Sequence, residues 1–186
     1  MVKQIYLLTR NKGKLLAAQN IFSKFGIEVK NIDKNFPEIQ ADSSLEIAKY
    51  SAEEAAKEFK VSVVREDHSL FINCLNGFPG PYTNYFDKTM PAEKLLELIR
   101  NTKDRSGYFE IAAAYAKASG EVKTFVFKVP IKISDKIQGN ERNWDRIIMF
   151  PESTRTFAEM TEEENEDIWD KNYIAIAEEI GKELHG

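Results

Sequence analysis

Cysteine and histidine are scarce in this sequence of 186 residues. It has one cysteine, Cys74, and two histidines. A lone cysteine cannot form a disulfide within the chain, which excludes a disulfide-stapled fold and favours a reducing compartment. His68 is the only histidine away from the C-terminus, and no second His or Cys lies near it, so the ligand spacing of a zinc site is missing. We therefore expect neither cross-links nor structural zinc to hold the fold together.

Long apolar runs and an excess of positive charge are also missing. Lys plus Arg number 26 and Asp plus Glu number 30, which gives a formal net charge of -4. This balance argues against a protein that coats nucleic acid or an anionic membrane, although it leaves room for a local basic pocket. No segment approaches the roughly 18 apolar residues of a membrane span, and the N-terminus has no small-residue cleavage site. We expect a cytoplasmic protein with neither a nucleic-acid polymer nor a membrane as its partner.

Strand and helix patterns alternate in the first half of the chain. Runs of β-branched and aromatic residues indicate strands, and apolar residues at helical spacing indicate helices. Ser43 with Glu46, and Thr161 with Glu164, are typical of capping boxes at helix starts. The expected strands are 2–9, 27–32, 61–66 with 69–73 as an open extension, and 146–150; the expected helices are 15–25, 43–59, 91–101 and a closing region over 161–184.

Two long runs, 107–118 and 121–133, flank Ser119 and Gly120. They are typical of a β-hairpin, although the alanines of the first run leave a helix open. Together with the strand and helix alternation, the hairpin predicts an α/β protein with a mixed sheet. The length fits a single domain over residues 1–186.

The stretch TRNKGK, residues 9–14, lies between the first expected strand and the first expected helix. Backbone N–H groups at a helix start attract anions, and Lys12 and Lys14 add positive charge, so the junction is a candidate polyphosphate site. It is not a Walker loop, because the glycines and the Gly-Lys-Ser/Thr ending are missing. A solvated turn with two surface lysines is the ordinary alternative.

Acidic residues follow at Glu38, Glu66 and Asp67. Mg²⁺ takes hard oxygen ligands, often one or two carboxylates plus substrate phosphates, and the carboxyl ends of strands in open α/β sheets are where ligands bind. Solubilising surface acids are the alternative.

The stretch NGFPGPY, residues 76–82, is either a rigid loop that shapes a pocket or simply a tight turn. Trp144 and Asp145 could stack on a base and accept purine N–H groups, or Trp144 could anchor the core.

In this order and spacing, the fragments resemble the inosine-triphosphate pyrophosphatase family, the house-cleaning enzymes for deaminated purine nucleoside triphosphates. The resemblance spans nearly the whole chain. TRNKGK is similar to the family's T-G-N-x-x-K, with Arg10 in place of the glycine. EDHSLFINCLNGFPGPY is similar to its acidic pair followed by G-x-P-G-x-Y, which is the most specific piece. PEIQ and TFAEMT, residues 37–40 and 156–161, resemble two further family segments.

The resemblance implies an elongated mixed sheet flanked by helices, two lobes with a central cleft, and a homodimer. It also implies Mg²⁺-dependent attack of water on nucleoside triphosphates such as ITP, dITP and XTP, releasing the monophosphate and pyrophosphate. Carried over by motif, the catalytic residues are Asp67, Glu66 and Lys14; the substrate-binding residues are Thr9, Asn11, Lys12, Lys14, Trp144, Asp145 and Lys171; and the metal ligands are Glu38 and Asp67.

The sequence departs from the family where the family reads the base. The family's F-G-Y/W-D-P is RNWDR here, with Arg142, Asn143 and Arg146 in place of Phe, Gly and Pro, and its S-H-R is WDK at 169–171. Asn tolerates left-handed backbone, so we expect the turn at Asn143 to survive. Lysine offers a mobile point charge where arginine offers a rigid fork, so Lys171 is a poor substitute for the family arginine.

Three further positions differ. A family lysine falls at Asn165, a helix glutamate falls at Ala17, and His68 stands where the family has Ser or Thr. The preferred interpretation is an enzyme of this family with a changed or relaxed base preference. The other is a nucleotide-binding or scaffolding relative that has lost turnover. Changes in a base pocket alter specificity whereas loss of metal ligands ends catalysis, so Glu38 and Asp67 discriminate the two.

Overall fold

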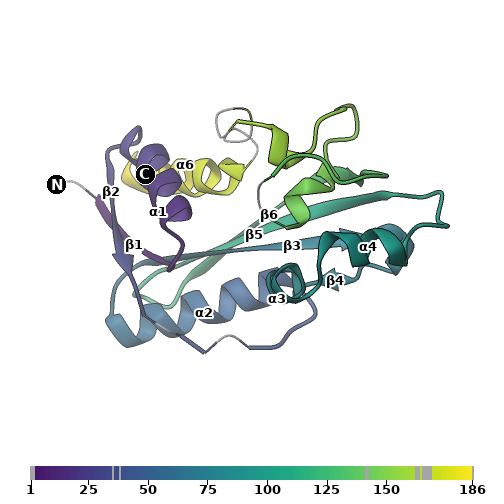
Figure 1. Ribbon diagram of the computed structural model, residues 1–186. Helices are drawn as coiled ribbons and strands as arrows, with labels where there is room; N and C mark the ends of the chain where they lie inside the picture. The colour runs from purple at the N-terminus through teal and green to yellow at the C-terminus, as the bar shows by residue number, and fades with distance from the viewer. Residues whose placement is uncertain are drawn as a thin grey trace. The chain divides into compact units, whose positions relative to one another are not determined.

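The computed structural model describes residues 3–34, 36–37, 39–140, 143–161, 164 and 169–185. Strands and helices alternate along the first half of the chain (Figure 1). The strands are β1 (Lys3–Leu8), β2 (Ile27–Ile32), β3 (Val63–Ile72), β4 (Pro79–Gly80), β5 (Ser106–Ala116), β6 (Val122–Ile133) and β7 (Ile148–Met149). The helices are α1 (Lys12–Ser23), α2 (Ser44–Phe59), α3 (Thr83–Thr89), α4 (Ala92–Leu98) and α6 (Lys171–His185), with short 3₁₀ turns at Asn73–Leu75, Trp144–Arg146 and Phe157–Glu159.

The strands form a mixed sheet. Hydrogen-bonded neighbours follow the order β2-β1-β3-β5-β6-β7, and β4 pairs with β3. β1 is parallel to β2 and to β3, whereas β4 runs antiparallel to β3 and β7 antiparallel to β6. The prediction of an α/β fold with a mixed sheet flanked by helices is confirmed. None of the described helices is long and apolar enough to cross a membrane.

The chain divides into two compact units. Unit 1 comprises residues 1–67, 111–127 and 166–186, and unit 2 comprises residues 68–110 and 128–165. Strands β3, β5 and β6 each contribute residues to both units. Each unit has its own hydrophobic core, and the candidate site residues of the N-terminal half all fall in unit 1.

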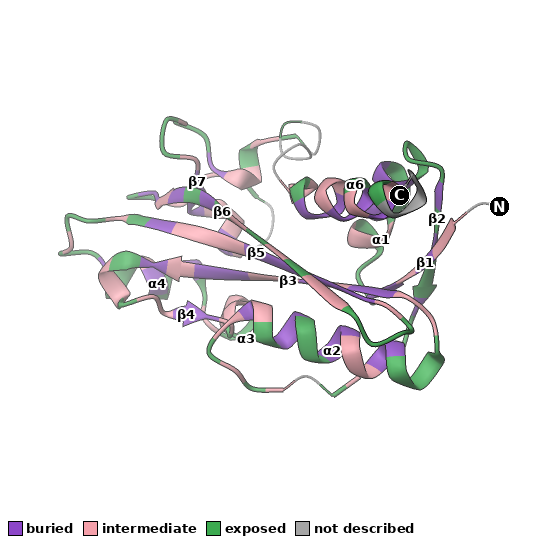
Figure 2. Cartoon of the chain, turned by 180° about the vertical axis from the view of Figure 1, so that it is seen from behind, coloured by how far each residue is buried: buried purple, intermediate pink, exposed green. Residues whose placement is uncertain are grey.

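The sheet of unit 1 is buried on both faces. α1 and α6 cover one face and α2 covers the other (Figure 1). Neighbouring strand residues alternate between the two layers, as the two-residue period of a strand requires. The α1/α6 layer includes Ile5, Leu7, Val64, Ala113 and Tyr115, and the α2 layer includes Leu8, Ile32, Val63, Ala114 and Ala116. Buried and exposed residues also alternate along α2, which presents a stripe of small alanines to the sheet (Figure 2).

The predicted hairpin is confirmed and the helix alternative for its first arm is excluded. β5 and β6 flank a turn in which Lys117 N donates to Glu121 O at 2.8 Å. Gly120 adopts a φ of 95°, a conformation that glycine reaches without steric cost. The alanines of β5 do not form a helix because their short side chains let helices pack on both sides of the strand.

The predicted helix start at Ser43 is confirmed. Ser43 Oγ accepts a hydrogen bond from Glu46 N at 3.2 Å, and α2 ends at Phe59, where we expected it. β3 begins at Val63 and continues to Ile72, so the open extension belongs to the strand. Pro91 is the N-cap of α4 rather than its first residue, and α4 ends at Leu98.

The expected strand over 146–150 is shorter than predicted. Only Ile148–Met149 pairs, because Arg146 closes the 3₁₀ turn before it. The stretch 76–82 is a tight turn that brings β4 back onto β3, with Gly77 and Gly80 at φ of 87° and 56°. The short helix that follows, α3, was not predicted.

Gly107 offers a test of packing in unit 2. A Cβ added there would lie 2.4 Å from the backbone oxygen of Phe71 and 3.1 Å from Ile131 Cδ1. Gly107→Ala should lower the free energy of unfolding by about 1–3 kcal/mol because the backbone of β3 cannot yield as a flexible side chain would. Gly181→Ala is the matched control: a Cβ there meets nothing within 4 Å, and alanine favours the helix by about 0.5–1 kcal/mol. Urea denaturation measures both, and equal stabilities would contradict this account of Gly107.

Candidate functional site

The loop between β1 and α1 caps the helix with its own side chains. Asn11 Oδ1 accepts hydrogen bonds from Gly13 N at 2.8 Å and from Lys14 N at 3.2 Å. Thr9 Oγ1 in turn accepts from Asn11 N at 3.1 Å. Asn11 therefore occupies two of the N–H groups that a helix start would otherwise present to an anion. The two cations of the predicted polyphosphate site lie at the start of α1, where Lys12 is exposed and Lys14 is half-buried.

Lys14 lies against a buried carboxylate. Its Nζ is 3.6 Å from Glu66 Oε2 and donates to the Glu66 backbone oxygen at 3.4 Å. The hydroxyl of Tyr173, from α6, donates to Glu66 Oε2 at 2.9 Å. Glu66 is 4% exposed and Tyr173 is 1% exposed. A buried charge needs such partners, and together they fix the direction in which Lys14 extends.

Tyr173 acts as the donor because a phenol is protonated at neutral pH and a carboxylate can only accept. Burial, followed by the neighbouring Glu66 carboxylate, raises the pKa of Tyr173 well above its ordinary value. The phenol therefore stays protonated into the alkaline range. Sequence reasoning missed Tyr173, because it looks like any other buried residue on an amphipathic helix.

Glu66 and Asp67, the acidic pair of the motif, point to opposite faces of the sheet. Val64 belongs to the α1/α6 layer and Val63 to the α2 layer. By the alternation of β3, Glu66 follows Val64 to the α1/α6 layer, where it meets Tyr173. Arg65 and Asp67 then share the α2 face. The two acids therefore cannot converge on one ion, and Asp67 is the half-buried carboxylate of the α2 face.

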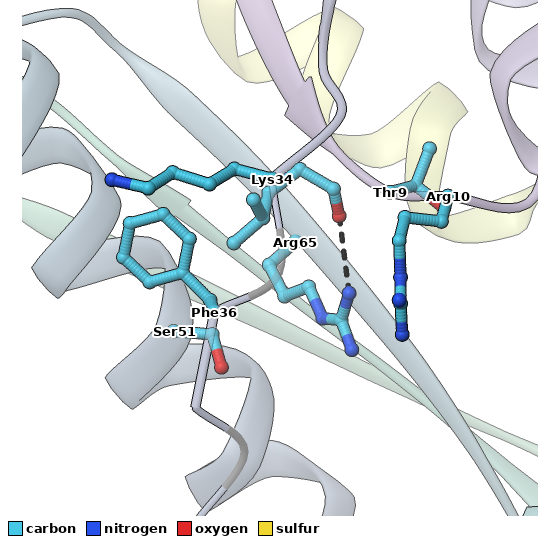
Figure 3. A pocket seen from close by; sticks show the side chains of 7 residues that line it. Thr9, Arg10, Lys34, Phe36, Ser51 and Arg65 are labelled. Atoms are coloured by element: carbon cyan, nitrogen blue, oxygen red, sulfur yellow. Dashed lines mark hydrogen bonds between the residues drawn. The ribbon is translucent and has the colours of Figure 1, made fainter.

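A small hollow opens on the α2 face of unit 1. Its volume is about 30 Å³, and its described lining is Leu8, Thr9, Arg10, Lys34, Phe36, Ser51 and Arg65 (Figure 3). Arg10 and Arg65 each bring a guanidinium group to this hollow. Arg65 and Ser51 were not predicted from the sequence. The one signal for Arg65 is its place in β3, where a cation stands between two buried valines and two acids.

Of the two metal ligands predicted from the resemblance, Glu38 and Asp67, the structure describes only Asp67. Glu38 lies outside the described residues. Among the described residues, no group of three or more His, Cys, Asp or Glu side chains is placed to hold a metal ion. Mg²⁺ in nucleotide sites needs only one or two carboxylates, because phosphate oxygens and waters complete its shell. Asp67, with its hard oxygens on the same face as Arg10 and Arg65, fits that donor set.

Trp144 lies in the core of unit 2. It is 2% exposed, and its indole Nε1 donates to Met90 O at 2.9 Å. The structure thus gives Trp144 the core-anchoring role that the sequence left open. Asp145 follows in the same 3₁₀ turn and is half-buried. Arg142 lies outside the described residues.

Asn143 supports this turn through its side chain. Its Nδ2 donates to Asp87 O and to Met90 O, each at 2.7 Å, and its Oδ1 accepts from Ala92 N at 2.7 Å. The expected turn is present, and the φ of -44° at Asn143 shows that it forms with right-handed backbone at this residue. Where the family has glycine, this chain has an asparagine whose side chain links the turn to α3, to Met90 and to α4.

Lys171, the remaining predicted substrate-binding residue, is the exposed first residue of α6 in unit 1. Asn165, the position of the family lysine, lies outside the described residues. Ala17 packs on the α1/α6 layer of unit 1, where a glutamate would be unfavourable.

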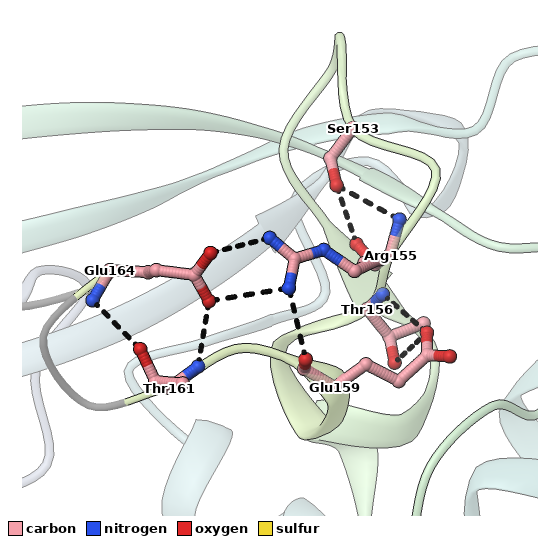
Figure 4. A network of polar contacts seen from close by, with 6 residues as sticks. All are labelled: Ser153, Arg155, Thr156, Glu159, Thr161 and Glu164. Carbon is pink, nitrogen blue, oxygen red and sulfur yellow. Dashed lines mark hydrogen bonds and ion pairs between the residues drawn. The ribbon is translucent and has the colours of Figure 1, made fainter.

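The TFAEMT segment ends in a polar network in unit 2 (Figure 4). Thr161 and Glu164 form the predicted capping box: Thr161 N donates to Glu164 Oε2 at 2.8 Å, and Glu164 N donates to Thr161 Oγ1 at 3.4 Å. Arg155 grips the same carboxylate with two nitrogens, at 2.5 and 3.3 Å. The hydrogen bond from Arg155, followed by that from the Thr161 N–H, holds the pKa of Glu164 below its ordinary value.

Comparison with known proteins shows which protein family has this mixed sheet and this cationic loop between β1 and α1. The Ham1 family matches residues 5–176. The chain therefore belongs to the Ham1 family, and the resemblance drawn from its motifs is confirmed.

Particular relatives support this membership. The chain is 39% identical over 163 residues to a dITP/XTP pyrophosphatase of Ignicoccus hospitalis, covering 87% of each chain. It is 36% identical over 162 residues to a dITP/XTP pyrophosphatase of Methanopyrus kandleri, covering 87% of this chain and 86% of the relative. The solved structure of the Staphylococcus aureus Ham1 protein matches with a TM-score of 0.81 and 28% identity over 99% of both chains.

Tyr173→Phe tests the buried hydrogen bond to Glu66. Loss of the hydroxyl leaves one oxygen of a buried carboxylate with a partner fewer, so the free energy of unfolding should fall by about 1–3 kcal/mol. Tyr85→Phe is the control, because Tyr85 is 64% exposed and should change stability by less than about 0.5 kcal/mol. Denaturant unfolding compares them, and a Tyr173 variant as stable as the control would show that the bond contributes nothing.

Arg155→Gln tests the network around Glu164. The pKa of Glu164 should rise toward about 4.3, the ordinary value, while that of Glu159 should move less because its first cause is the Thr156 N–H. Since the folded pKa is depressed, these contacts stabilise the fold above the unfolded pKa and the effect is lost as pH falls through the folded pKa. Carboxyl NMR titration reads both groups. An unmoved Glu164 would rule out Arg155 as the main cause.

Proposed function

We propose that this protein is a Mg²⁺-dependent nucleoside-triphosphate pyrophosphatase. The observation that carries the proposal is the Ham1 family match over residues 5–176, supported by relatives named dITP/XTP pyrophosphatase at 36–39% identity over most of the chain. The reaction breaks the anhydride bond between the α and β phosphates. A water oxygen bonds to the α-phosphorus, the bridging oxygen leaves with pyrophosphate, and the nucleoside monophosphate remains.

The phosphates are assigned to the junction of β1 and α1 in unit 1, where Lys12 and Lys14 lie. Lys12 and Lys14 supply positive charge, and Lys14 is held in place by the Glu66 carboxylate. Thr9 and Asn11 shape the loop through their hydrogen bonds to its backbone. Positioned cations are suited to phosphoryl transfer, in which negative charge shifts among phosphate oxygens and fixed groups stabilise the transition state.

Asp67 is proposed to hold Mg²⁺ together with Glu38, and to orient the attacking water. When bound, Mg²⁺ would neutralise phosphate charge and polarise the reacting phosphoryl group. Of the two acids named from the motif, Asp67 suits this task better because Glu66 is buried and already holds Tyr173 and Lys14. Glu66 then acts as a positioning residue for Lys14.

The base preference is proposed to be changed or relaxed relative to the dITP and XTP of the relatives' names. Trp144 offers little exposed surface for stacking, and WDK replaces S-H-R at 169–171. Asp145 and Lys171 remain as polar candidates for contacts to the base. A homodimer and a cytoplasmic location complete the proposal, and they are tested by sedimentation and by fractionation of cells.

Asp67→Asn tests the reaction. Pyrophosphate release is measured from deaminated and ordinary nucleoside triphosphates, with and without Mg²⁺. The wild-type protein should require the metal, and the variant should lose at least about 10²-fold in kcat, because an amide is a far weaker Mg²⁺ ligand than a carboxylate. Asp42→Asn, at an exposed acid outside the site, is the control and should keep its rate.

The outcomes separate the two interpretations. Turnover of inosine or xanthosine nucleotides by the wild type would mean that its base preference matches the names of the relatives. Turnover of nucleotides with another base would mean a new specificity. Unchanged hydrolysis in the Asp67 variant would remove Asp67 from the metal site. A folded wild-type protein that binds nucleotides in calorimetry yet hydrolyses none would be the non-catalytic relative.

A further inference from the structure

The hollow on the α2 face of unit 1 carries a concentration of positive charge. Arg10, Lys34 and Arg65 line it, and none of the described lining residues is acidic (Figure 3). The charge of Lys34 is already balanced, because its ammonium pairs with Glu58 and lies 5.3 Å from the ring centre of Phe59. Arg10 and Arg65 supply the two guanidinium groups that line the hollow.

Arg65 is fixed in place and Arg10 is available. Nη1 of Arg65 donates to the backbone oxygen of Leu8 at 3.2 Å, which anchors the guanidinium at the end of β1. Arg10 is exposed, and among the described residues it makes no ion pair or hydrogen bond through its side chain. A planar guanidinium binds phosphate oxygens with two parallel hydrogen bonds, so an anchored and an available arginine together make a clamp for such a group.

Ser51 adds an independent sign of a ligand. It is 1% exposed, lines the hollow from α2, and its Oγ has no hydrogen-bond partner among the residues that the structure describes. A buried hydroxyl is costly to leave unsatisfied, and a hydroxyl donates readily to an anionic oxygen. With a volume of about 30 Å³, the hollow has room for about one oxygen-sized group, while the rest of a phosphate would lie at its open mouth.

We infer that Arg10, Arg65 and Ser51 form a subsite for the pyrophosphate end of the nucleoside triphosphate. The inference rests on the proposed function and adds to it a second set of phosphate contacts, on the α2 face, distinct from Lys12 and Lys14. Arg65 and Asp67 share this face two residues apart on β3, so a phosphate gripped here lies on the side of the sheet where Asp67 works.

The test uses inorganic pyrophosphate as the probe, without added metal and at constant ionic strength. Calorimetry compares the full-length wild type with Arg10→Gln, Arg65→Gln, Arg65→Lys and Ser51→Ala. Each charge-removing change should weaken binding by about tenfold or more, as loss of a charged hydrogen bond implies. Arg65→Lys should fall between wild type and Arg65→Gln, because lysine keeps the charge but not the fork. The same variants should raise KM for the triphosphate more than they lower kcat.

Lys24→Gln is the matched control. It removes one positive charge from the same unit, at the exposed C-terminal end of α1, and should change binding by less than about twofold. Arg10 is exposed, so Arg10→Gln decides the question even if a change at the anchored Arg65 unfolds the protein.

The outcomes distinguish this inference from the proposed function. Equal pyrophosphate affinity in wild type and Arg10→Gln, or no binding by the wild type, would overturn the subsite even if the enzyme hydrolyses nucleotides. Pyrophosphate binding that depends on Arg10, in a protein that hydrolyses no nucleotide, would keep the subsite and reject the reaction.

Discussion

The two-residue period of β3 is the constraint on which the candidate site depends. In unit 1 this strand is covered on both faces, so every residue along it must serve one of two layers. A sheet with one solvated face could leave a charged side chain in water at no cost. Here the run from Arg65 to Asp67 places three charged residues within β3, and alternation directs Glu66 to one face and Arg65 and Asp67 to the other. The two acids that are neighbours in the sequence motif therefore lie in different environments.

The charges on the two faces are handled differently. On the α1/α6 face, Glu66 is enclosed and its neighbours are fixed, so the arrangement is rigid before any ligand arrives. Rigid charged groups favour catalysis because they need not reorganise as the reaction proceeds. On the α2 face, one arginine is anchored to the backbone while the other stays in solvent. The two faces of β3 thus carry charged groups of different kinds, an enclosed carboxylate on one side and arginines on the other.

Local patterns predicted most of unit 1. The limits of β2, the cap of α2 and the hairpin all follow from residues within a few positions of one another, where period and turn chemistry decide the outcome. The capping box at Thr161 and Glu164 was predicted for the same reason. The motifs also placed the chain in its family, since their order and spacing survive even where single residues differ.

Contacts between distant residues were beyond sequence reasoning. Tyr173 and Glu66 lie 107 residues apart, and nothing near either one indicates the other. Asn11 was predicted to bind phosphate, and the sequence did not show that it also caps α1, where its Oδ1 accepts hydrogen bonds from Gly13 N and Lys14 N. Trp144 matches the family motif and Asn143 departs from it. The structural roles of both depend on backbone carbonyl groups of Asp87 and Met90, which lie more than 50 residues away in the sequence.

The exposed Arg10 also bears on how ligands reach this protein. The molecule as a whole carries a net charge of -4, so a long polyanion meets repulsion over most of its length. A short anion can approach one arginine within the Debye length of about 8 Å at physiological ionic strength, where the local field outweighs the distant charge. If Arg10 binds phosphate as proposed, we expect it to favour short anions over long nucleic acids, because a long polyanion must also meet the rest of this surface.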